Sequence, residues 1–473
     1  MPESENPIAS KPPPEHPACA SGTVADAQSL PKDTQEAKEK YQRGELADAE
    51  RLCRMILNVN SDCFDALHLL GLIAAQTQRM PEAVALLSRA VSIDPSRAEA
   101  HGNLGNVLHE MKRYEQALES FNRALKINPD LELAHCNRGI VLSDLNRHEA
   151  ALESYEHALK LKPDYVEAHL NLSLHLLRHG NFARGWEEYE WRWQMAKNRD
   201  SRITLCAPVW EGQKLHGSLL VWNEHGLGDE IFYAGMLNDL APYAEYITVC
   251  VDHRLVPLFQ RSFGNMHVIS WQMLAPDAQF DAHIALGSLG RYLRSSVSAF
   301  PDMAKPYLRA CESRARNLRA KIAQKKRLMC GLSWISKGPA AGKDKSLRLQ
   351  DIEPILTVPG MDFVDLQYGD TDQEQAALYA AKGLTLRRVT EIDNFNDLDG
   401  LAALIEACDI IVTVSNTTAH LAAALGKPVL LMLPFSQGLL WYWQMEGVDN
   451  RWYPTVKCFR QPVVPRCEGG AEL

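Results

Sequence analysis

The sequence predicts an α-helical solenoid followed by an α/β region that consists of two Rossmann-like halves. Two observations support this division. From about residue 30 to 199, small residues and prolines return every 34 positions, whereas apolar segments of four to eight residues alternate with helical ones after residue 205. A repeat of this length is typical of stacked helix pairs, and the alternation is typical of βαβ units that build a parallel sheet.

The composition limits the classes of function. The chain has 473 residues, of which 46% are hydrophobic, enough for two or three domains with cores of their own. A net charge of -9 argues against a nucleic-acid binder, and the absence of a long apolar run argues against a membrane span. Eleven cysteines without paired or metal-type spacing indicate reduced thiols and no metal site. With no secretory leader in the sequence, we expect a cytoplasmic protein.

The solenoid prediction depends on four positions that stay in phase over three units. Small residues at these places let two antiparallel helices approach closely, and a proline closes each unit. Clear repeats are expected at 64–97, 98–131 and 132–165, with degenerate repeats at 30–63 and 166–199 that cap the ends. Residues 1–29 are proline-rich and are expected to be disordered. The residues in phase are Gly71, Gly105 and Gly139, Ala83, Ala117 and Ala151, Ala90, Ala124 and Ala158, and Pro95, Pro129 and Pro163.

The α/β region is expected to divide into residues 205–325 and 326–462, followed by a tail at 463–473. A charged helix from Lys305 to Lys326 is expected to join the two halves. Strands are expected at Ser218–Asn223, Tyr246–Val251, His267–Ile269, Ala282–Ala285, Leu328–Trp334, Asp362–Gln367, Leu384–Val389, Ile410–Val414 and Val429–Leu433. Between the solenoid and this region, Trp186, Tyr189 and Trp193 share a helical stripe. We interpret this stripe mainly as packing that joins the two parts, with sugar stacking as the alternative.

A glycine-rich turn follows the first expected strand of the α/β region. Gly226 and Gly228 allow a tight turn and let another molecule approach the backbone. Asp229 follows at the start of a helix, where a carboxylate can take a proton from an acceptor hydroxyl. The same carboxylate also stabilises the positive end of a helix dipole, and the spacing alone does not separate the two roles.

A basic loop and a polar turn are the candidates for holding an anionic ligand. Lys337, Lys343 and Lys345 follow the first strand of the second half, in a loop that either clamps a diphosphate or is simply solvated. After the strand Ile410–Val414 come four residues that favour helix N-caps, and a histidine lies in the first turn of the helix that they open. These residues are Ser415, Asn416, Thr417, Thr418 and His420.

These motifs carry two resemblances. The 34-residue units resemble the tetratricopeptide repeat (TPR), and the second part resembles the heptosyltransferase-like (family 9) nucleotide-sugar transferases of GT-B fold. The segments that carry the second resemblance are FARGWEEYEWRW, LLVWNEHGLGDEIFYA, GLSW followed by KSLRL, FVDLQYGD, VSNTTAHLAAALGKPV and RWYP. The joined architecture is similar to that of O-linked N-acetylglucosamine transferases.

The resemblance implies a metal-independent glycosyltransferase of hexosyl or heptosyl type that needs no cofactor. A nucleotide-diphosphate sugar is the expected donor, and a protein presented by the TPR groove is the expected acceptor. Asp229 matches the family's catalytic base, and the donor's diphosphate is expected near Ser415 to His420 and a loop lysine. Ser415-Asn416 stands where heptosyltransferases usually have Asp-Thr. The alternative is therefore a TPR interaction scaffold with an inactive transferase-like region, and homo-oligomer formation is left open.

Overall fold

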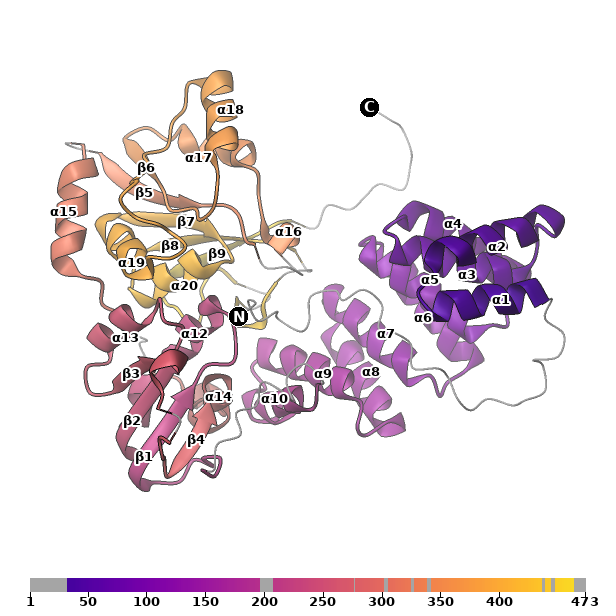
Figure 1. Cartoon of the computed structure of the whole chain (residues 1–473), viewed down its shortest axis with the longest axis horizontal. Coiled ribbons are helices and arrows are strands. Elements are labelled where there is room, and N and C mark those ends of the chain that lie inside the picture. The colour runs from indigo at the N-terminus through magenta and orange to yellow at the C-terminus, as the bar shows by residue number, and fades with distance from the viewer. Residues whose placement is uncertain are drawn as a thin grey trace. The chain divides into compact units, whose positions relative to one another are not determined.

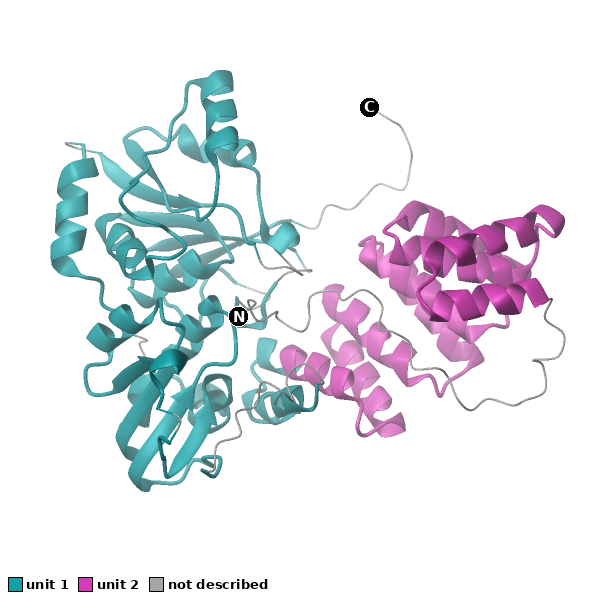
Figure 2. Ribbon diagram, viewed as in Figure 1, with its two compact units in different colours: residues 1–9, 176–473 teal, residues 10–175 magenta. Residues whose placement is uncertain are grey.

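The computed structural model describes residues 32–195, 207–275, 277–301, 305–324, 327–337, 342–435, 439–443 and 447–462. The chain divides into two compact units, with the boundary between His175 and Leu176 (Figure 2). In chain order, the first unit below is the magenta part of Figure 2, and the second unit is the teal part from Leu176 onward. The predicted disordered segment 1–29 and the tail at 463–473 lie outside the described residues. Among the described helices, none combines the length and the apolar character that a membrane span requires.

The first unit is a stack of antiparallel helix pairs (Figure 1). The second helix of each pair packs against the first helix of the next, so contacts run between neighbours along the stack. The helices are α1 Lys32–Gln42, α2 Leu46–Val59, α3 Phe64–Gln76, α4 Met80–Ile93, α5 Ala98–Glu110, α6 Tyr114–Ile127, α7 Glu132–Asp144, α8 His148–Leu161 and α9 Val166–Arg178, which crosses the unit boundary.

The in-phase glycines let the two helices of a pair touch, as the sequence predicts. A Cβ atom on Gly71 would lie 2.7 Å from Cγ of Leu87, and one on Gly139 would lie 2.6 Å from Cε1 of Tyr155. Gly105 faces the ring of Phe121 in the same way, with a would-be Cβ 2.9 Å from Cζ. Since large side chains already fill these spaces, a side chain at Gly71, Gly105 or Gly139 would force its neighbour to shift.

The second unit opens with α10 (Phe182–Tyr189) and η1 (Glu190–Gln194) and then forms two parallel sheets. The first sheet belongs to the amino-terminal half, residues 207–301, and its strand order is β3-β2-β1-β4. Its strands are β1 Leu215–Trp222, β2 Ala244–Val251, β3 His267–Ser270 and β4 Ala282–Ala285. Its helices are α12 Leu227–Ala234, η2 Leu237–Leu240, α13 Val256–Ser262, η3 Trp271–Met273, η4 Leu286–Ser288, α14 Leu289–Leu293 and η5 Val297–Ala299.

The carboxyl-terminal half, residues 305–462, carries a five-stranded parallel sheet of order β6-β5-β7-β8-β9. The strands are β5 Leu328–Ser333, β6 Met361–Asp365, β7 Ile410–Val414, β8 Val429–Leu433 and β9 Val456–Arg460. The helices are α15 Glu312–Ile322, α16 Gly342–Lys345, η6 Leu349–Ile352, α17 Glu353–Leu356, α18 Asp372–Lys382, α19 Leu398–Ala407, α20 Thr417–Ala424 and η7 Trp441–Trp443.

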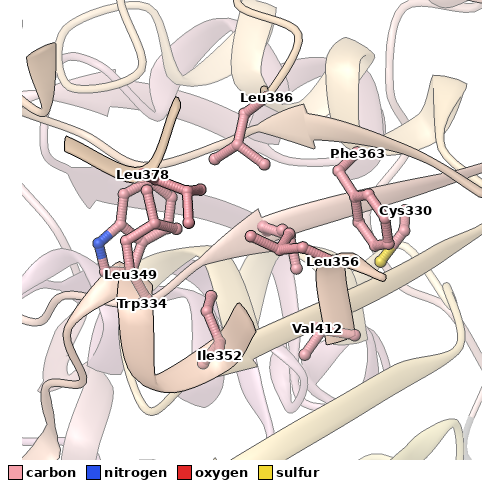
Figure 3. Close-up of a cluster of buried hydrophobic side chains, with 10 residues drawn as sticks. Cys330, Trp334, Leu349, Ile352, Leu356, Phe363, Leu378, Leu386 and Val412 are labelled. Carbon is pink, nitrogen blue, oxygen red and sulfur yellow. The ribbon is translucent and has the colours of Figure 1, made fainter. Parts of the chain in front are cut away.

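A hydrophobic cluster holds this second sheet against its covering helices (Figure 3). Trp334 is fully buried in it, and its indole Nε1 donates to Oε2 of Glu374 at 2.9 Å, so the one polar atom of the ring is satisfied. The cluster comprises Cys330, Leu332, Trp334, Leu349, Ile352, Leu356, Phe363, Leu378, Leu386 and Val412.

Two predicted elements are wrong, a strand and the start of a helix. Leu384–Val389 is not a strand, because only Arg387 pairs with β6, through a single bridge to Val364. The fifth strand of the sheet is β9 instead, near the end of the chain.

The charged helix predicted from Lys305 begins only at Glu312. Residues 305–311 ahead of it form no regular secondary structure. The amides of Tyr307 and Leu308 both donate to the carbonyl of Ala424, at 3.0 and 3.1 Å, and so satisfy the carboxyl end of α20.

Candidate functional site

The glycine-rich turn lies at the carboxyl end of β1, an interior strand of its sheet, and opens α12. A Cβ on Gly228 would lie 3.1 Å from Cδ2 of His420, which belongs to α20 in the other half. The missing side chain therefore lets α12 pack closely against α20. The N-termini of two helices, one from each half, are brought together in this way, and both carry partial positive charge.

Asp229 is half-buried in the first turn of α12 and is approached from the carboxyl-terminal half. The hydroxyl of Tyr442, in η7, donates to its Oδ1 at 3.2 Å. Lys345, in α16, is also close enough to interact with the carboxylate: burial lowers the pKa of Lys345, and the Asp229 charge opposes that change. The structure thus brings a carboxylate and an ammonium group from different halves within range of a charge interaction.

Glu230 fixes the position of the turn that carries Asp229. Its carboxylate accepts from Nδ2 of Asn223 at 2.8 Å and from the backbone N–H of Asp252 at 2.9 Å, and so links the ends of β1 and β2. Burial raises its pKa to about 7, and no cation offsets the burial fully. We assign Glu230 a positioning role.

The polar turn before α20 is satisfied largely by the protein itself. Asn416 caps the helix by accepting from the N–H of Ala419, while its Nδ2 donates to Oγ of Ser333 at 2.7 Å. Oγ of Ser415 accepts from Nε1 of Trp443 at 2.9 Å. Ser415, Asn416 and Thr418 are buried, and Thr417 is partly exposed. What the turn offers a ligand is therefore mainly the first backbone N–H groups of α20, which have no acceptor within a helix.

The three predicted lysines lie in different environments. Lys337 and Lys343 are exposed, and the backbone N–H of Lys337 donates to the hydroxyl of Tyr368 at 2.9 Å. Lys345 is the lysine of this set that interacts with both Asp229 and His420. Residues 338–341 of the loop lie outside the described residues.

Two members of the aromatic stripe, Trp186 and Tyr189, are buried and the third, Trp193, is partly buried, which favours packing over sugar stacking. Trp186 is 1% exposed and donates from Nε1 to the carbonyl of Arg294 at 2.9 Å. Arg192 was not among the predicted site residues. Its guanidinium is 1% exposed and donates to both carboxylate oxygens of Glu224 at 2.9 and 2.8 Å. Glu224 lies two residues before Gly226, so this bidentate pair ties the segment to the glycine-rich turn. Glu224, a carboxylate next to the glycine-rich turn, is the feature of the sequence that could have pointed to this ion pair.

A second feature missed from the sequence is a set of asparagines in the solenoid. Asn103, Asn137 and Asn171 occupy one position of the 34-residue repeat, and each is partly exposed. Each donates from Nδ2 to the preceding repeat: Asn103 to Nε2 of His68 at 3.0 Å and Asn137 to Oδ1 of Asn106 at 2.8 Å. Asn171 donates to Sγ of Cys136 at 3.6 Å. The 34-residue spacing that identifies the glycines also identifies Asn103, Asn137 and Asn171.

Comparison with known proteins identifies the repeats. Residues 34–98, 98–131 and 133–165 match tetratricopeptide repeat models. The first unit is therefore a TPR solenoid, and the chain joins it to a region of two parallel sheets.

A curated relative is Protein FlbA of Caulobacter vibrioides, 32% identical over 304 residues. The match covers 60% of this chain, and the chain spans half the length of FlbA.

Solved structures also resemble part of the chain. MamA from Desulfovibrio magneticus is 18% identical, with a TM-score of 0.32 over 37% of this chain and 96% of that one. PilF of Pseudomonas aeruginosa is 22% identical, with a TM-score of 0.33 over 34% of this chain and 74% of that one. YrrB, described as a TPR protein with an unusual peptide-binding site, is 18% identical, with a TM-score of 0.32 over 36% of this chain and 87% of that one.

Proposed function

We propose that the solenoid binds a protein and that the second unit transfers a sugar to it from a nucleotide-diphosphate donor. The match to tetratricopeptide repeats supports the first half of this proposal. One observation carries the second half: Asp229, in α12, and Lys345, from the other half of the second unit, are close enough for their charges to interact, and α12 packs on α20. A base and a cation in one place suit the transfer of a group whose leaving part is anionic.

In the proposed reaction, Asp229 takes the proton of an acceptor hydroxyl, with Tyr442 holding Oδ1 so that Oδ2 is available. The hydroxyl oxygen bonds to the anomeric carbon as the bond from that carbon to the diphosphate breaks. The leaving diphosphate keeps the electron pair. Lys345 and the first N–H groups of α20, at Thr417 and Thr418, stabilise its charge in place of a metal ion.

The asparagine row is the proposed contact for the protein partner. A primary amide carries a donor and an acceptor, which matches the N–H and C=O groups of an extended peptide backbone. Because Asn103, Asn137 and Asn171 recur at the same repeat position, they supply this contact at regular intervals. The row therefore favours an acceptor or partner that lies extended along the solenoid.

A scaffold without catalysis is the competing function. It is favoured by the polar turn, because Ser415 and Asn416 bond to the protein and not toward an open site. It is favoured as well by the family models, whose matches lie within residues 34–165. In that case the second unit is a rigid support, and only the solenoid binds.

Nucleotide binding separates the two functions. Isothermal titration of the full chain with uridine, guanosine, adenosine and cytidine diphosphates and their sugar conjugates should give binding to one base. Lys345→Met should weaken that binding about tenfold, the effect of one charge-assisted hydrogen bond. Lys214→Met is the control, since Lys214 is exposed and precedes β1 at the opposite end of that strand.

Mass spectrometry of a host-cell lysate treated with the bound sugar nucleotide should then show a protein with the added sugar mass. If no nucleotide binds and no product forms, the transferase half of the proposal is wrong.

A further inference from the structure

We propose that His420 is locked as the tautomer with its proton on Nδ1, and that its bare Nε2 accepts a hydrogen bond from a hydroxyl of the transferred sugar. The tautomer follows from the direction of a chain of hydrogen bonds in the second unit. The identity of the hydroxyl rests on the proposed function. The tautomer and the hydroxyl together give His420 a role other than donating a hydrogen bond to the diphosphate.

The chain of hydrogen bonds begins at a backbone carbonyl. The hydroxyl of Tyr307 lies 2.7 Å from the carbonyl oxygen of Ile231, in α12. A carbonyl oxygen has no proton to give, so the single proton of Tyr307 must lie in this bond. The oxygen of Tyr307 is then free only to accept in its other bond.

The remaining directions follow one after another. The hydroxyls of Tyr307 and Tyr453 are 3.2 Å apart, and the proton between them must come from Tyr453. The oxygen of Tyr453 is 3.1 Å from Nδ1 of His420, so in this last bond it can only accept. Nδ1 of His420 must therefore carry a proton. A carbonyl of α12 in this way sets the tautomer of a histidine in α20.

The second ring nitrogen carries no proton, because the ring is neutral. Burial, with a smaller contribution from the charge of Lys345, lowers the pKa of His420 to about 3. The side chain is 2% exposed, and within the described residues Nε2 has no hydrogen-bond partner. Nε2 faces the glycine-rich turn, where a Cβ on Gly228 would lie 3.6 Å from it. An acceptor without a partner among the described residues, carried by a buried side chain, thus faces the turn that carries Asp229.

The chemistry of a bare imidazole nitrogen selects the ligand. Its lone pair repels a phosphate oxygen and attracts a group that has a proton to donate. Lys345 interacts with the ring by charge but forms no hydrogen bond with it among the described residues. A sugar hydroxyl is the donor group that the proposed substrate brings, while its diphosphate is left to Lys345 and the N–H groups of α20.

The tautomer is tested by nitrogen NMR of the full chain labelled with 15N-histidine. His420, assigned by its loss in His420→Phe, should show a protonated, pyrrole-type Nδ1 and a bare, pyridine-type Nε2 at neutral pH. Tyr307→Phe frees the Tyr453 proton to be donated to Nδ1, so the proton of His420 should move to Nε2. Tyr379→Phe, at an exposed tyrosine of α18, should leave the spectrum unchanged. A wild-type spectrum with a protonated Nε2, or no change in Tyr307→Phe, would overturn the assignment.

The ligand is tested by comparing two titrations of His420→Phe, with thermal unfolding as the check on folding. The nucleotide sugar should bind about tenfold more weakly than to the wild type, and the bare nucleoside diphosphate should bind equally well. Equal losses for both ligands would place Nε2 on the diphosphate and refute the proposal. If the wild type binds neither ligand, the transferase proposal fails, while the NMR result on the tautomer still stands on its own.

Discussion

Two turns of the second unit have the same architecture and opposite chemistry. Each leads from the carboxyl end of an interior parallel strand into a helix of eight residues, β1 into α12 and β7 into α20. Before α20 the polar side chains turn inward and bond to Ser333 and Trp443. At the start of α12 there are two glycines and the half-buried Asp229. One turn is thus a fixed frame that offers backbone groups, and the other presents the carboxylate that we propose as the base.

The largest effect should come from removing the reactive side chain. Asp229→Asn keeps the shape of the turn but cannot take a proton, so kcat for sugar transfer should fall by about 100-fold or more. Nucleotide affinity, measured by titration, should stay close to the wild-type value. Asp277→Asn, at an exposed carboxylate of the same half, is the control. Transfer at the wild-type rate in Asp229→Asn would mean that the two turns do not differ in the proposed way.

The next effect concerns the support of the reactive turn. Burial raises the pKa of Glu230 to about 7, so between the ordinary value of 4.5 and about 7 the folded protein binds a proton that the unfolded chain releases. The free energy of unfolding should therefore fall as the pH rises through this range, by on the order of 2 kcal/mol. Glu230→Gln should flatten this dependence. Urea unfolding of both proteins at several pH values measures it, and equal slopes would contradict the role of burial.

The contact between the two turns should be sensitive to one methyl group. In Gly228→Ala the new Cβ would lie 3.1 Å from Cδ2 of His420, so the buried His420 ring or α12 must shift by a few tenths of an ångström. We expect a loss of about 1–3 kcal/mol in the free energy of unfolding, as for other overpacked sites. Gly264→Ala adds its methyl to open space and should be within about 0.5 kcal/mol of the wild type. Thermal unfolding compares the two variants, and equal behaviour would argue against close packing of the turns.

The smallest effect should come from the hydroxyl that orients the base. Tyr442→Phe keeps the ring, which stacks on Phe232 with centroids 4.3 Å apart, and removes only the donor to Oδ1 of Asp229. Loss of one hydrogen bond to a charged group should lower kcat about tenfold with little change in KM for the donor. Tyr246→Phe, at a tyrosine that is 69% exposed, is the control. An unchanged kcat would show that Asp229 needs no orientation from η7.

Local patterns were enough to predict much of the fold. Ala282–Ala285, Ile410–Val414 and Val429–Leu433 form strands with the predicted ends, since short apolar runs between polar residues have few alternatives. The repeat could also be predicted, because Gly71, Gly105 and Gly139 are 34 residues apart and each lies against a large side chain. The contact of residues 305–311 with α20 was not predictable, because Tyr307 and Leu308 donate to the carbonyl of Ala424, which is more than 100 positions away.

The candidate site was predictable only in its parts. Asp229 and the turn at Ser415 could be placed at the ends of strands, but their partners come from elsewhere in the chain. Tyr442 reaches Asp229 from more than 200 positions away, and Tyr307 controls His420 through Tyr453. Such pairings depend on how the halves pack, which periodicity does not encode. The chemical roles of these residues stay predictions.

The contacts of Phe232 bear on how the second unit unfolds. Its ring, in α12, lies against Tyr442, Trp441 and Trp452, with centroids 4.3, 5.5 and 4.7 Å away. Three aromatic side chains of the carboxyl-terminal half thus complete the core of the amino-terminal half, and neither half can lose its structure without exposing them. The second unit should therefore melt in one calorimetric transition. The repeats, in contact only along the stack, are free to fray from their ends.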